Sequence, residues 1–357
     1  MNYAPSNCAL PLRRRRARVT AMATVRFGVL ADVQYADKAD KEVESGVRPY
    51  REALGKLERA VDALAAAHED AEGPPLSFCM NLGDSIDGHG EGETDWFARS
   101  VTDLKRVAAC FGRLRSSGVP LHHVVGNHCI CRGSVSRAAF AREMECATDW
   151  GAWGGRSYGS FCPTPSLRCV VLDSMDLALS GWWDDQGNGD EDECRERRAE
   201  SESFLAARPL ESEPQLKRYN GGLGRGQLRW LEGELREAER AGQAVVVFMH
   251  HPVTVGEADS TGPREHMPCW NHEEVRALLL ASPAFGALLA GHHHRGGYQR
   301  VDGRHFVTVE SILEAPAGTT AYLVATWDPA AGTLTLDAQG SAASSHVLPI
   351  ALPATSR

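Results

Sequence analysis

The sequence predicts an α/β fold, and two observations point to this class. Short apolar segments rich in β-branched residues alternate along the chain with longer segments of helical periodicity. The apolar segments are almost continuously hydrophobic, which is typical of strands in a sheet that is covered on both faces. In such sheets the functional residues gather just beyond the carboxyl ends of the strands.

The elements follow from this alternation in chain order. Strands are predicted at residues 25–30, 76–82, 121–125, 167–172, 244–249, 285–290, 305–310 and 321–327. Helices are predicted at residues 49–67, 96–115, 226–241 and 273–280. Between about residues 180 and 215 the alternation stops, because this segment is acidic and rich in small residues. We expect a surface insertion there, either a solvated and partly disordered loop or a lid over the site.

The composition limits the classes of function. A chain of 357 residues that is 43% hydrophobic is expected to be a soluble globular protein. Its net charge of -9 argues against binding to nucleic acid or to an anionic membrane. No apolar segment approaches the roughly 20 residues of a membrane-spanning helix. The ten cysteines are scattered, so we expect reduced thiols in an intracellular protein.

The first 23 residues differ from the rest of the chain. They contain no acidic residue and carry arginine at positions 13–16 and 18. We expect a disordered leader, with an organelle transit peptide as the alternative. Residues 24–345 are then expected to form a single domain and a monomer. We expect a cytoplasmic protein, or one imported into an organelle through the leader.

Residue types that bind metals follow five of the predicted strands. In chain order they are Asp32 and Gln34, Asp84 and Asp87, Asn127 and His128, His250, and His292 and His294. Each is a weak signal alone, but the complete series is improbable by chance. Two divalent cations roughly 3.5–4 Å apart catalyse the hydrolysis of phosphate esters and anhydrides, and they need a shared carboxylate and further ligands. Asp84 is the natural bridge, since Gly83 before it permits a tight turn. Mixed carboxylate, amide and imidazole ligands favour Mn(II), Fe(II) or Mg(II) over a thiolate zinc site.

This ordered series resembles the calcineurin-like metallophosphoesterase superfamily over about residues 27–295. The resemblance implies a four-layer α/β sandwich in which helices flank two central mixed β-sheets. It implies that one metal is bound by Asp32, Gln34, Asp84 and His294, and the other by Asp84, Asn127, His250 and His292. It also implies that His128 is catalytic, facing the scissile phosphate as an acid or charge stabiliser. Asp87 is expected to support the site from behind or to cap a helix.

Gln34 narrows the resemblance to one branch. Most members of the superfamily carry histidine at this position, and a neutral amide oxygen is a weaker donor that favours a hard ion such as Mn(II). Asp-Val-Gln, followed by an aromatic residue and Ala-Asp, resembles the manganese-dependent ADP-ribose/CDP-alcohol diphosphatases. The segments at residues 48–54, 219–235, 269–271, 296–298 and 310–316 also resemble that family.

The resemblance to this branch implies hydrolysis of a nucleoside diphosphate linked to a second alcohol. ADP-ribose would give AMP and ribose 5-phosphate, and CDP-choline or CDP-glycerol would give CMP and a phospho-alcohol. Cyclic ADP-ribose is a further expected substrate. The alternatives are a cyclic-nucleotide phosphodiesterase or phosphoprotein phosphatase, against which Gln34 argues, and a non-catalytic scaffold, against which the complete ligand set argues. Nucleic-acid processing would rest on the arginine tract alone.

Contacts to the substrate are less firmly indicated than the metal ligands. The candidates are Tyr35, Arg48, Arg51, Asn220 and Cys269. Tyr35 is either a residue that stacks on the base or ribose or a packing aromatic. The two arginines either reach the second phosphate or are solvated. Asn220 lies in a turn, which is either close to the substrate or a tight turn without contact to it.

Five further positions lie beside the predicted ligands or in segments that resemble the family. His251 and His293 are not expected to be ligands, since adjacent residues of an extended segment point in opposite directions. Cys129 stands where many members of the superfamily carry glutamate. Glu310 and Glu314 are either partners of the ligands or groups that face the substrate.

Overall fold

The computed structural model describes residues 23–43, 46–70, 73–90, 92–131, 133–183, 192–254, 265–342 and 345–354. The leader expected over residues 1–23 lies outside the described residues except for Ala23, which precedes the first strand.

Two six-stranded sheets form the centre of the protein. The first has the order β14-β13-β12-β1-β4-β5, and the second has the order β10-β11-β9-β8-β7-β6. The strands of the first are β1 (Val25–Leu30), β4 (Leu76–Asn81), β5 (Leu121–His123), β12 (Ala321–Asp328), β13 (Thr333–Gly340) and β14 (His346–Pro349). Those of the second are β6 (Gly159–Thr164), β7 (Leu167–Val171), β8 (Ala244–Met249), β9 (Phe285–Ala290), β10 (Gly297–Val301) and β11 (Arg304–Thr308). A small hairpin of β2 (Lys41–Val43) and β3 (Gly46–Arg48) lies apart from both.

Both sheets are mixed, and their parallel strands supply the ends that carry the predicted ligands. β1, β4 and β5 run parallel to one another, as do β7, β8, β9 and β11. The antiparallel pairings involve β12, β13 and β14 in the first sheet and β6 and β10 in the second. Because parallel strands end at the same edge, the residues that follow them are brought together.

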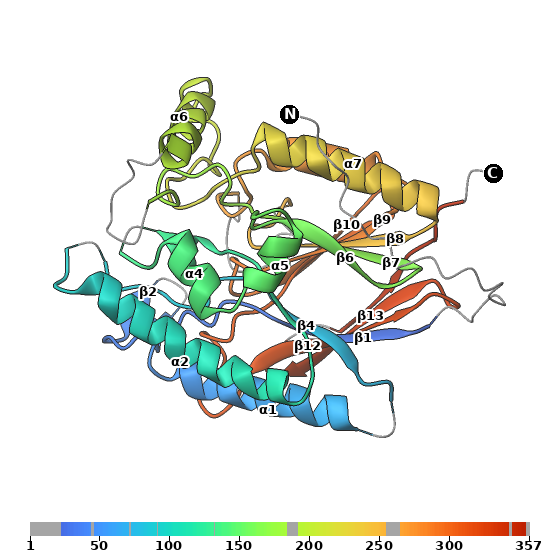
Figure 1. Cartoon of the computed structure of the whole chain (residues 1–357), viewed down its shortest axis with the longest axis horizontal. Helices are drawn as coiled ribbons and strands as arrows, with labels where there is room; N and C mark the ends of the chain where they lie inside the picture. The colour runs from blue at the N-terminus through green and yellow to red at the C-terminus, as the bar shows by residue number, and fades with distance from the viewer. Residues whose placement is uncertain are drawn as a thin grey trace.

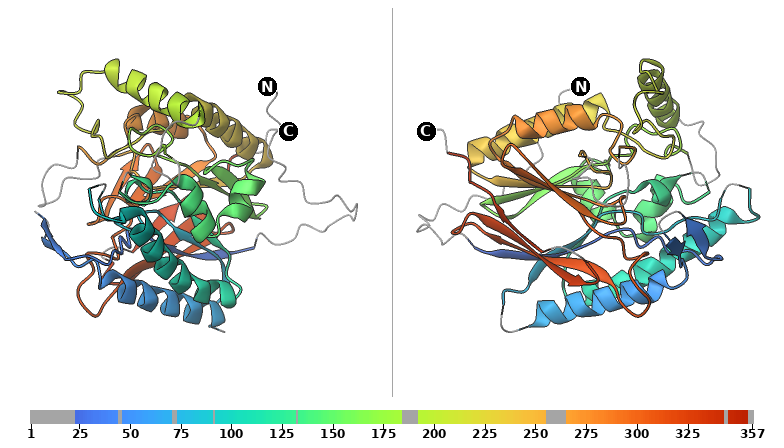
Figure 2. Two further views of the ribbon diagram at one scale, coloured as in Figure 1. Left: turned by 60° about the vertical axis from the view of Figure 1, so that its left-hand side comes forward. Right: turned by 180° about the vertical axis from the view of Figure 1, so that it is seen from behind.

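Helices cover the outer face of each sheet, so the expected four-layer sandwich is confirmed (Figure 1). α1 (Ala53–Glu69) and α2 (Trp96–Ser116) pack on the first sheet, and α7 (Arg225–Ala241) and α8 (His272–Leu280) pack on the second. Figure 2 shows the same order of layers from two further sides. The predicted helices and strands are all present, with ends that differ by a few residues.

Besides the apolar cores between each sheet and its helices, a further apolar core fills the space between the two sheets. The rings of Phe27 on β1 and Phe78 on β4 stack with centroids 4.6 Å apart. Phe248 on β8 meets both rings edge-on, at 5.9 and 6.3 Å. Aromatic pairs of this geometry add stabilisation beyond the burial of their area, so they fix the two sheets face to face.

The expectation for the acidic segment at residues 180–215 is corrected in part. The segment contains a helix, α6 (Asp192–Ala206), where a loop was expected. It is rich in Glu, Arg and Ala, which favour helix even without a broad apolar face, and only Cys194 and Ser201 of the helix are buried. Residues 184–191 lie outside the described part of the chain.

Other elements were not predicted because they are short or because their pattern is ambiguous. They are the β2–β3 hairpin, the strands β6, β10, β13 and β14, and the helices α3 (Asn127–Ile130), α4 (Arg137–Glu143) and α5 (Ala147–Ala152). β14 pairs with β13 beyond residue 345, and Leu348 and Ile350 are buried in the inter-sheet core. The folded chain therefore continues past the predicted C-terminal boundary.

Two further expectations concern the membrane and the cysteines. None of the helices in the described part of the chain is long and apolar enough to cross a membrane. No disulfide joins the cysteines among the described residues.

A buried lysine on α1 holds the segment that follows β11 against this helix. The side chain of Lys56 is 1% exposed, and its Nζ donates to the carbonyl oxygens of Leu313 and Ala315 at 2.7 and 2.6 Å. Burial lowers the pKa of this ammonium. The lysine thus satisfies two carbonyl groups of a segment that reaches the candidate site.

Lys56→Met is therefore expected to lower the free energy of unfolding by about 2–4 kcal/mol, because the two buried carbonyls lose their donor while the apolar stem is kept. Urea denaturation at pH 7 measures the change. The matched control is Lys105→Met on the exposed face of α2, which should stay within about 0.5 kcal/mol of the parent. Equal effects of the two variants would contradict this role of Lys56.

Candidate metal centre

The carboxyl edges of the two sheets meet, and hydrogen bonds hold the segments that follow their strands. The amide of Gln34 donates to the carbonyl of Asp84 at 2.7 Å, within the first sheet. The imidazole Nδ1 of His250, after β8, lies 2.9 Å from the carbonyl oxygen of Leu82, after β4. This second contact links the two sheets directly at the site.

Two fully buried carboxylates lie at the centre of this edge. Asp84 accepts a hydrogen bond from the amide of His128 on Oδ1 at 2.8 Å and one from Gln34 Nε2 on Oδ2 at 3.0 Å. Asp32 accepts from the amide of His292 on Oδ2 at 2.9 Å, while its Oδ1 has no hydrogen-bond partner. Each carboxylate is thus held by one oxygen through a backbone amide, which leaves the other oxygen facing the site.

The electrostatics of the two carboxylates differ. Burial raises the pKa of Asp32, and the imidazoles of His250 and His294 offset this only in part. Burial alone would also raise the pKa of Asp84, but the imidazoles of His250 and His128 outweigh this effect and lower the pKa of that carboxyl. Asp32 is therefore a buried acid whose negative charge is not compensated by the protein alone.

Imidazole and amide groups complete the cluster beside Asp84. The Oδ1 atom of Asn127 lies 2.9 Å from Nε2 of His250 and 3.1 Å from Nδ1 of His292. The Nε2 atom of His250 is also 3.3 Å from Asp84 Oδ2. Burial and the neighbouring imidazoles lower the pKa of His292, so its ring is neutral, as a metal ligand requires.

His294 lies on the side of Asp32 and is oriented by an acidic residue. Its Nε2 is 3.7 Å from Asp32 Oδ1, and its Nδ1 is 2.7 Å from Glu314 Oε1. Arg48 Nε donates to the same Glu314 oxygen at 3.4 Å. Burial raises the pKa of Glu314, but the contacts with His294 and Arg48 outweigh it and set that pKa at about 2. The sequence left the roles of Glu310 and Glu314 open, and this contact identifies Glu314 as a partner of a predicted ligand.

The donor set fits divalent cations. The oxygens and nitrogens described above lie about 3–4 Å apart, the separation expected for neighbouring ligands around an ion that binds at about 2.1 Å. Four buried side-chain atoms of the cluster that could bind a metal have no hydrogen-bond partner: Asp32 Oδ1, Gln34 Oε1, His251 Nε2 and His292 Nε2. Buried polar atoms are rarely left unpaired, so the convergence of these atoms suits the binding of cations.

The backbone is strained at the same positions. Non-glycine residues with positive φ in the described chain include Asp32 (52°), Gln34 (42°), Asp84 (49°) and His292 (69°). Left-handed backbone costs such residues about 1 kcal/mol or more each, and it concentrates at functional sites. Gly126 allows the closest approach, because a Cβ atom there would lie 2.2 Å from Asp84 Oδ1.

His128 lies beside the cluster and is held by an acidic residue. Its Nδ1 is 2.9 Å from Asp87 Oδ1, and Asp87 also bonds to the ammonium of Lys38. Burial lowers the pKa of His128, but the carboxylates of Asp87 and Asp84 outweigh it and raise that pKa to about 9. Asp87 therefore orients His128. It does not bond to a predicted metal ligand, and it does not cap a helix.

His251 lies closer to the ligands than the alternation argument expected. Its ring centroid is 4.2 Å from that of His292, and donor atoms of His250, His251 and His292 all lie within 4.8 Å of one another. The argument failed because β8 ends at Met249, so the chain is no longer extended at the two histidines. His251 Nδ1 is 2.8 Å from Ser174 Oγ, whereas His293 Nδ1 is 3.1 Å from the carbonyl of Gly296.

Three of the proposed substrate contacts are corrected, and a fourth, Arg51, lies on the surface. Tyr35 is 5% exposed and its hydroxyl accepts from Arg106, while Asn220 is fully buried and donates to three backbone carbonyls. Cys269 is fully buried as well. Arg51 is exposed and pairs with Asp37 at 2.8 Å. The first three side chains therefore serve packing, and Arg51 is held on the surface, so only Arg48 adjoins the predicted ligands.

Two further residues near the site differ in their exposure to solvent. Tyr219 is 47% exposed and its ring centroid lies 6.4 Å from that of His292, so it offers an accessible aromatic face. Its position before the Asn-Gly-Gly segment was the only sequence signal for it. Cys129 is fully buried, and its sulfur accepts from the amide of Ser85 at 3.3 Å, which indicates a structural role.

Comparisons with known proteins agree with this geometry. The model of the calcineurin-like phosphoesterase family matches residues 25–296. A protein of Oryza sativa subsp. japonica named manganese-dependent ADP-ribose/CDP-alcohol diphosphatase is 32% identical over 83% of this chain and 86% of its own length. A protein of the same name from Arabidopsis thaliana is 31% identical, over 83% and 88%. The crystal structure of a dimetal phosphatase from Danio rerio matches with a TM-score of 0.75 and 25% identity, over 92% of this chain and 99% of that one.

Asp87→Asn is expected to lower the pKa of His128 by about one unit or more, because the carboxylate nearest to its ring is lost. The imidazole keeps its proton up to about pH 9 in the parent, so in the variant it loses the proton at a lower pH. NMR titration of the metal-free protein measures this. Asp62→Asn, an exposed carboxylate on α1, is the control and should leave His128 unchanged. An unaltered titration of His128 in Asp87→Asn would contradict the assignment.

Proposed function

The chain belongs to the calcineurin-like phosphoesterases and, within them, to the manganese-dependent ADP-ribose/CDP-alcohol diphosphatases, and we propose that it hydrolyses the diphosphates of ADP-ribose and CDP-alcohols. It is a manganese-dependent hydrolase with two metal ions. ADP-ribose then gives AMP and ribose 5-phosphate, and CDP-choline or CDP-glycerol gives CMP and a phospho-alcohol. Cyclic ADP-ribose is a further candidate substrate.

The convergence of seven ligand-type side chains on one buried edge is the observation that carries the proposal. One cation would be held by Asp32, Gln34, Asp84 and His294, and the other by Asp84, Asn127, His250 and His292. Divalent cations bound there supply positive charge that neutralises the carboxylates, polarises a phosphoryl oxygen and acidifies a water. The unpaired oxygens of Asp32 and Gln34 and the unpaired Nε2 of His292 support these assignments.

The residues around the centre position the substrate and the proton. In the hydrolysis a water oxygen bonds to one phosphorus while the bond from that phosphorus to the bridging oxygen breaks. His128, protonated and held by Asp87, would donate its Nε2 hydrogen to the departing phosphate oxygen or stabilise its charge. Arg48, which bonds to Glu314 beside His294, would contact the second phosphate.

The accessible ring of Tyr219 supports a role in recognising the nucleoside. A half-exposed aromatic ring at the edge of the centre is suited to stack on a base. Such stacking tolerates both adenine and cytosine, because every base offers a planar π face. The net charge of -9 supports free small molecules, rather than nucleic acid or membranes, as substrates. We also propose that the protein is a monomer and acts in the cytoplasm.

Manganese-loaded protein is expected to hydrolyse ADP-ribose and CDP-choline at least about tenfold faster than cyclic AMP or a phosphopeptide, because Arg48 and Tyr219 suit a second phosphate and a base, while the neutral ligand Gln34 favours Mn(II). Steady-state assays with Mn(II) and with Mg(II) measure this, and the rate with Mn(II) should be the higher. Chelation of the metals should abolish all four activities. Preference for cyclic AMP or the phosphopeptide, or indifference to manganese, would refute the proposal.

Glu314→Gln is expected to weaken manganese binding by about 10–100-fold, because Glu314 orients His294 through its Nδ1. Isothermal titration of the metal-free protein with Mn(II) measures affinity without reference to turnover. Glu273→Gln on exposed α8 is the matched control and should bind Mn(II) like the parent. Parental affinity in Glu314→Gln would show that this carboxylate does not support a metal ligand.

A further inference from the structure

Three histidines gather on one side of the candidate metal centre, and the proposed manganese sites use only two of them. His250 and His251 follow β8, and His292 follows the neighbouring parallel strand β9. One donor nitrogen from each of the three rings lies within 4.8 Å of the other two. The second sheet therefore supplies a cluster of nitrogens, whereas the buried carboxylates of Asp32 and Asp84 follow strands of the first sheet.

The hydrogen bonds of the three rings leave the same nitrogen available in each. In every ring the Nδ1 atom lies within hydrogen-bond distance of an oxygen. In chain order of the rings, these oxygens are the carbonyl of Leu82 at 2.9 Å, the hydroxyl of Ser174 at 2.8 Å and the side-chain amide of Asn127 at 3.1 Å. Among the described residues, the Nε2 atoms of His251 and His292 have no hydrogen-bond partner. A ring that donates its Nδ1 hydrogen to an oxygen keeps the Nε2 lone pair for a metal, as ligating histidines do.

The spacing of the rings suits a single four-coordinate ion. Imidazole nitrogens bind zinc at about 2.0–2.1 Å in a tetrahedral arrangement, which places the ring centroids around one ion about 5 Å apart. The centroid of His250 lies 5.0 Å from that of His251 and 5.1 Å from that of His292, and the last two centroids are 4.2 Å apart. Three imidazoles can thus occupy three corners of a tetrahedron, and a water molecule can complete it.

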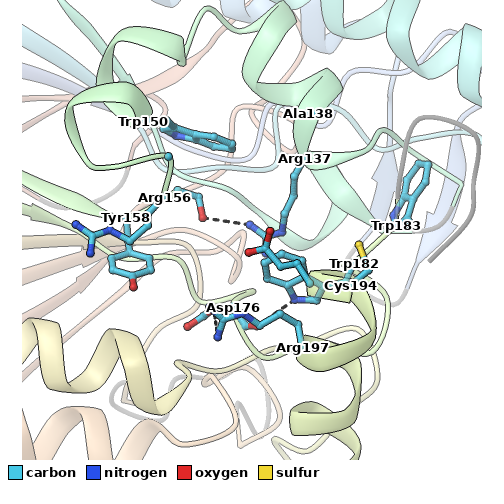
Figure 3. A pocket seen from close by; sticks show the side chains of 13 residues that line it. Arg137, Ala138, Trp150, Arg156, Tyr158, Asp176, Trp182, Trp183, Cys194 and Arg197 are labelled. Atoms are coloured by element: carbon cyan, nitrogen blue, oxygen red, sulfur yellow. Dashed lines mark hydrogen bonds and ion pairs between the residues drawn. The ribbon is translucent and has the colours of Figure 1, made fainter. Parts of the chain in front are cut away.

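The ring of His251 is held in place by the loop that follows β7. The hydroxyl oxygen of Ser174 accepts from the backbone amide of His251 at 3.2 Å, in addition to its contact with Nδ1 of the ring. The same loop is fixed from its other side. Arg197, which lines the pocket between α4 and α6, pairs with Asp176 at 3.3 Å (Figure 3), and Gln227 donates to Asp176 at 3.1 Å. His251 is therefore oriented by the protein itself.

We infer that His250, His251 and His292 form a site for Zn(II), and that zinc bound there inhibits the manganese-dependent reaction. His250 and His292 are also proposed ligands of the second manganese ion, so the zinc ion and that manganese ion exclude each other. Zinc binds a given set of nitrogen and oxygen ligands more tightly than manganese does. The inhibition rests on the proposed function, whereas the binding of zinc does not.

His251 is the residue that distinguishes the two ions. Manganese favours carboxylate and carbonyl oxygens, which Asp84 and Asn127 supply beside the two shared histidines. Zinc favours a third imidazole, as in other sites with three histidine ligands. Replacement of His251 therefore removes a ligand from zinc and none from the proposed manganese set.

The test is isothermal titration of the metal-free full chain with Zn(II) and, separately, with Mn(II). His251→Phe, which keeps a planar ring, should weaken the tightest zinc binding at least about tenfold, since loss of even an outer partner of a ligand costs 10–100-fold. Its affinity for Mn(II) should change by less than about threefold, which also shows that the variant is folded. His346→Gln on β14 is the matched control and should bind both ions like the parent.

A second measurement uses the parent chain alone. X-ray absorption at the zinc edge, with one equivalent of Zn(II) bound, should show three imidazole ligands. Two imidazoles or fewer would overturn the inference. Parental zinc affinity in His251→Phe would overturn it as well, and so would equal losses of zinc and manganese affinity in that variant.

Inhibition is measured with the manganese-loaded protein and ADP-ribose. The concentration of Zn(II) that halves the rate should rise at least about tenfold in His251→Phe, because the competing ion has lost a ligand. Equal inhibition of the parent and the variant would reject the inference while sustaining the proposed function. Tight binding of zinc through three imidazoles without hydrolysis of ADP-ribose would reject the proposed function while sustaining the zinc site.

Discussion

The burial of two carboxylates at one edge of the fold is the constraint on which the site depends. Asp32 and Asp84 are fully buried, and a buried charge must be paired or must bind a cation. Backbone amides satisfy one oxygen of each, but Asp32 Oδ1 has no hydrogen-bond partner. The neutral ring of His292 and the amide of Asn127 lie beside them, and these two groups supply lone pairs rather than charge. The cluster is therefore organised for cations that the polypeptide does not itself provide.

The mixed topology of the sheets explains how residues far apart in the chain form this cluster. Parallel strands of both sheets end at a common edge, and the Phe27, Phe78 and Phe248 rings fix the sheets face to face. The backbone is left-handed at Asp32 and Asp84, where the chain has just left β1 and β4. This strain is tolerated because the surrounding core determines the path of the chain on both sides.

Many of the strands and the candidate ligands could be predicted from the sequence, because they are indicated by short local patterns of residues. Continuous apolar runs identified β1, β8 and β9 to the residue, and the polar residues that end such runs are the predicted ligands, which the structure brings together at one edge. β10 and β13 were missed, since partly polar strands at or next to the edge of a sheet are defined by their neighbours as much as by their own pattern. The loop residues were harder: Tyr35 follows a ligand directly, yet the chain turns it into the core. His251 shows the opposite error, because the alternation rule was applied beyond the end of β8.

The contacts behind the ligands could not be predicted, because they join distant segments. Glu314 reaches His294 from beyond β11, and Lys56 anchors that segment from α1. The central claim is that two cations occupy the edge built by these contacts. The most direct test is a crystal structure of the manganese-loaded protein with anomalous data at the manganese edge. Two peaks that share Asp84 as a ligand are expected, one beside Asp32, Gln34 and His294 and the other beside Asn127, His250 and His292. A single peak, or peaks away from Asp84, would contradict the account.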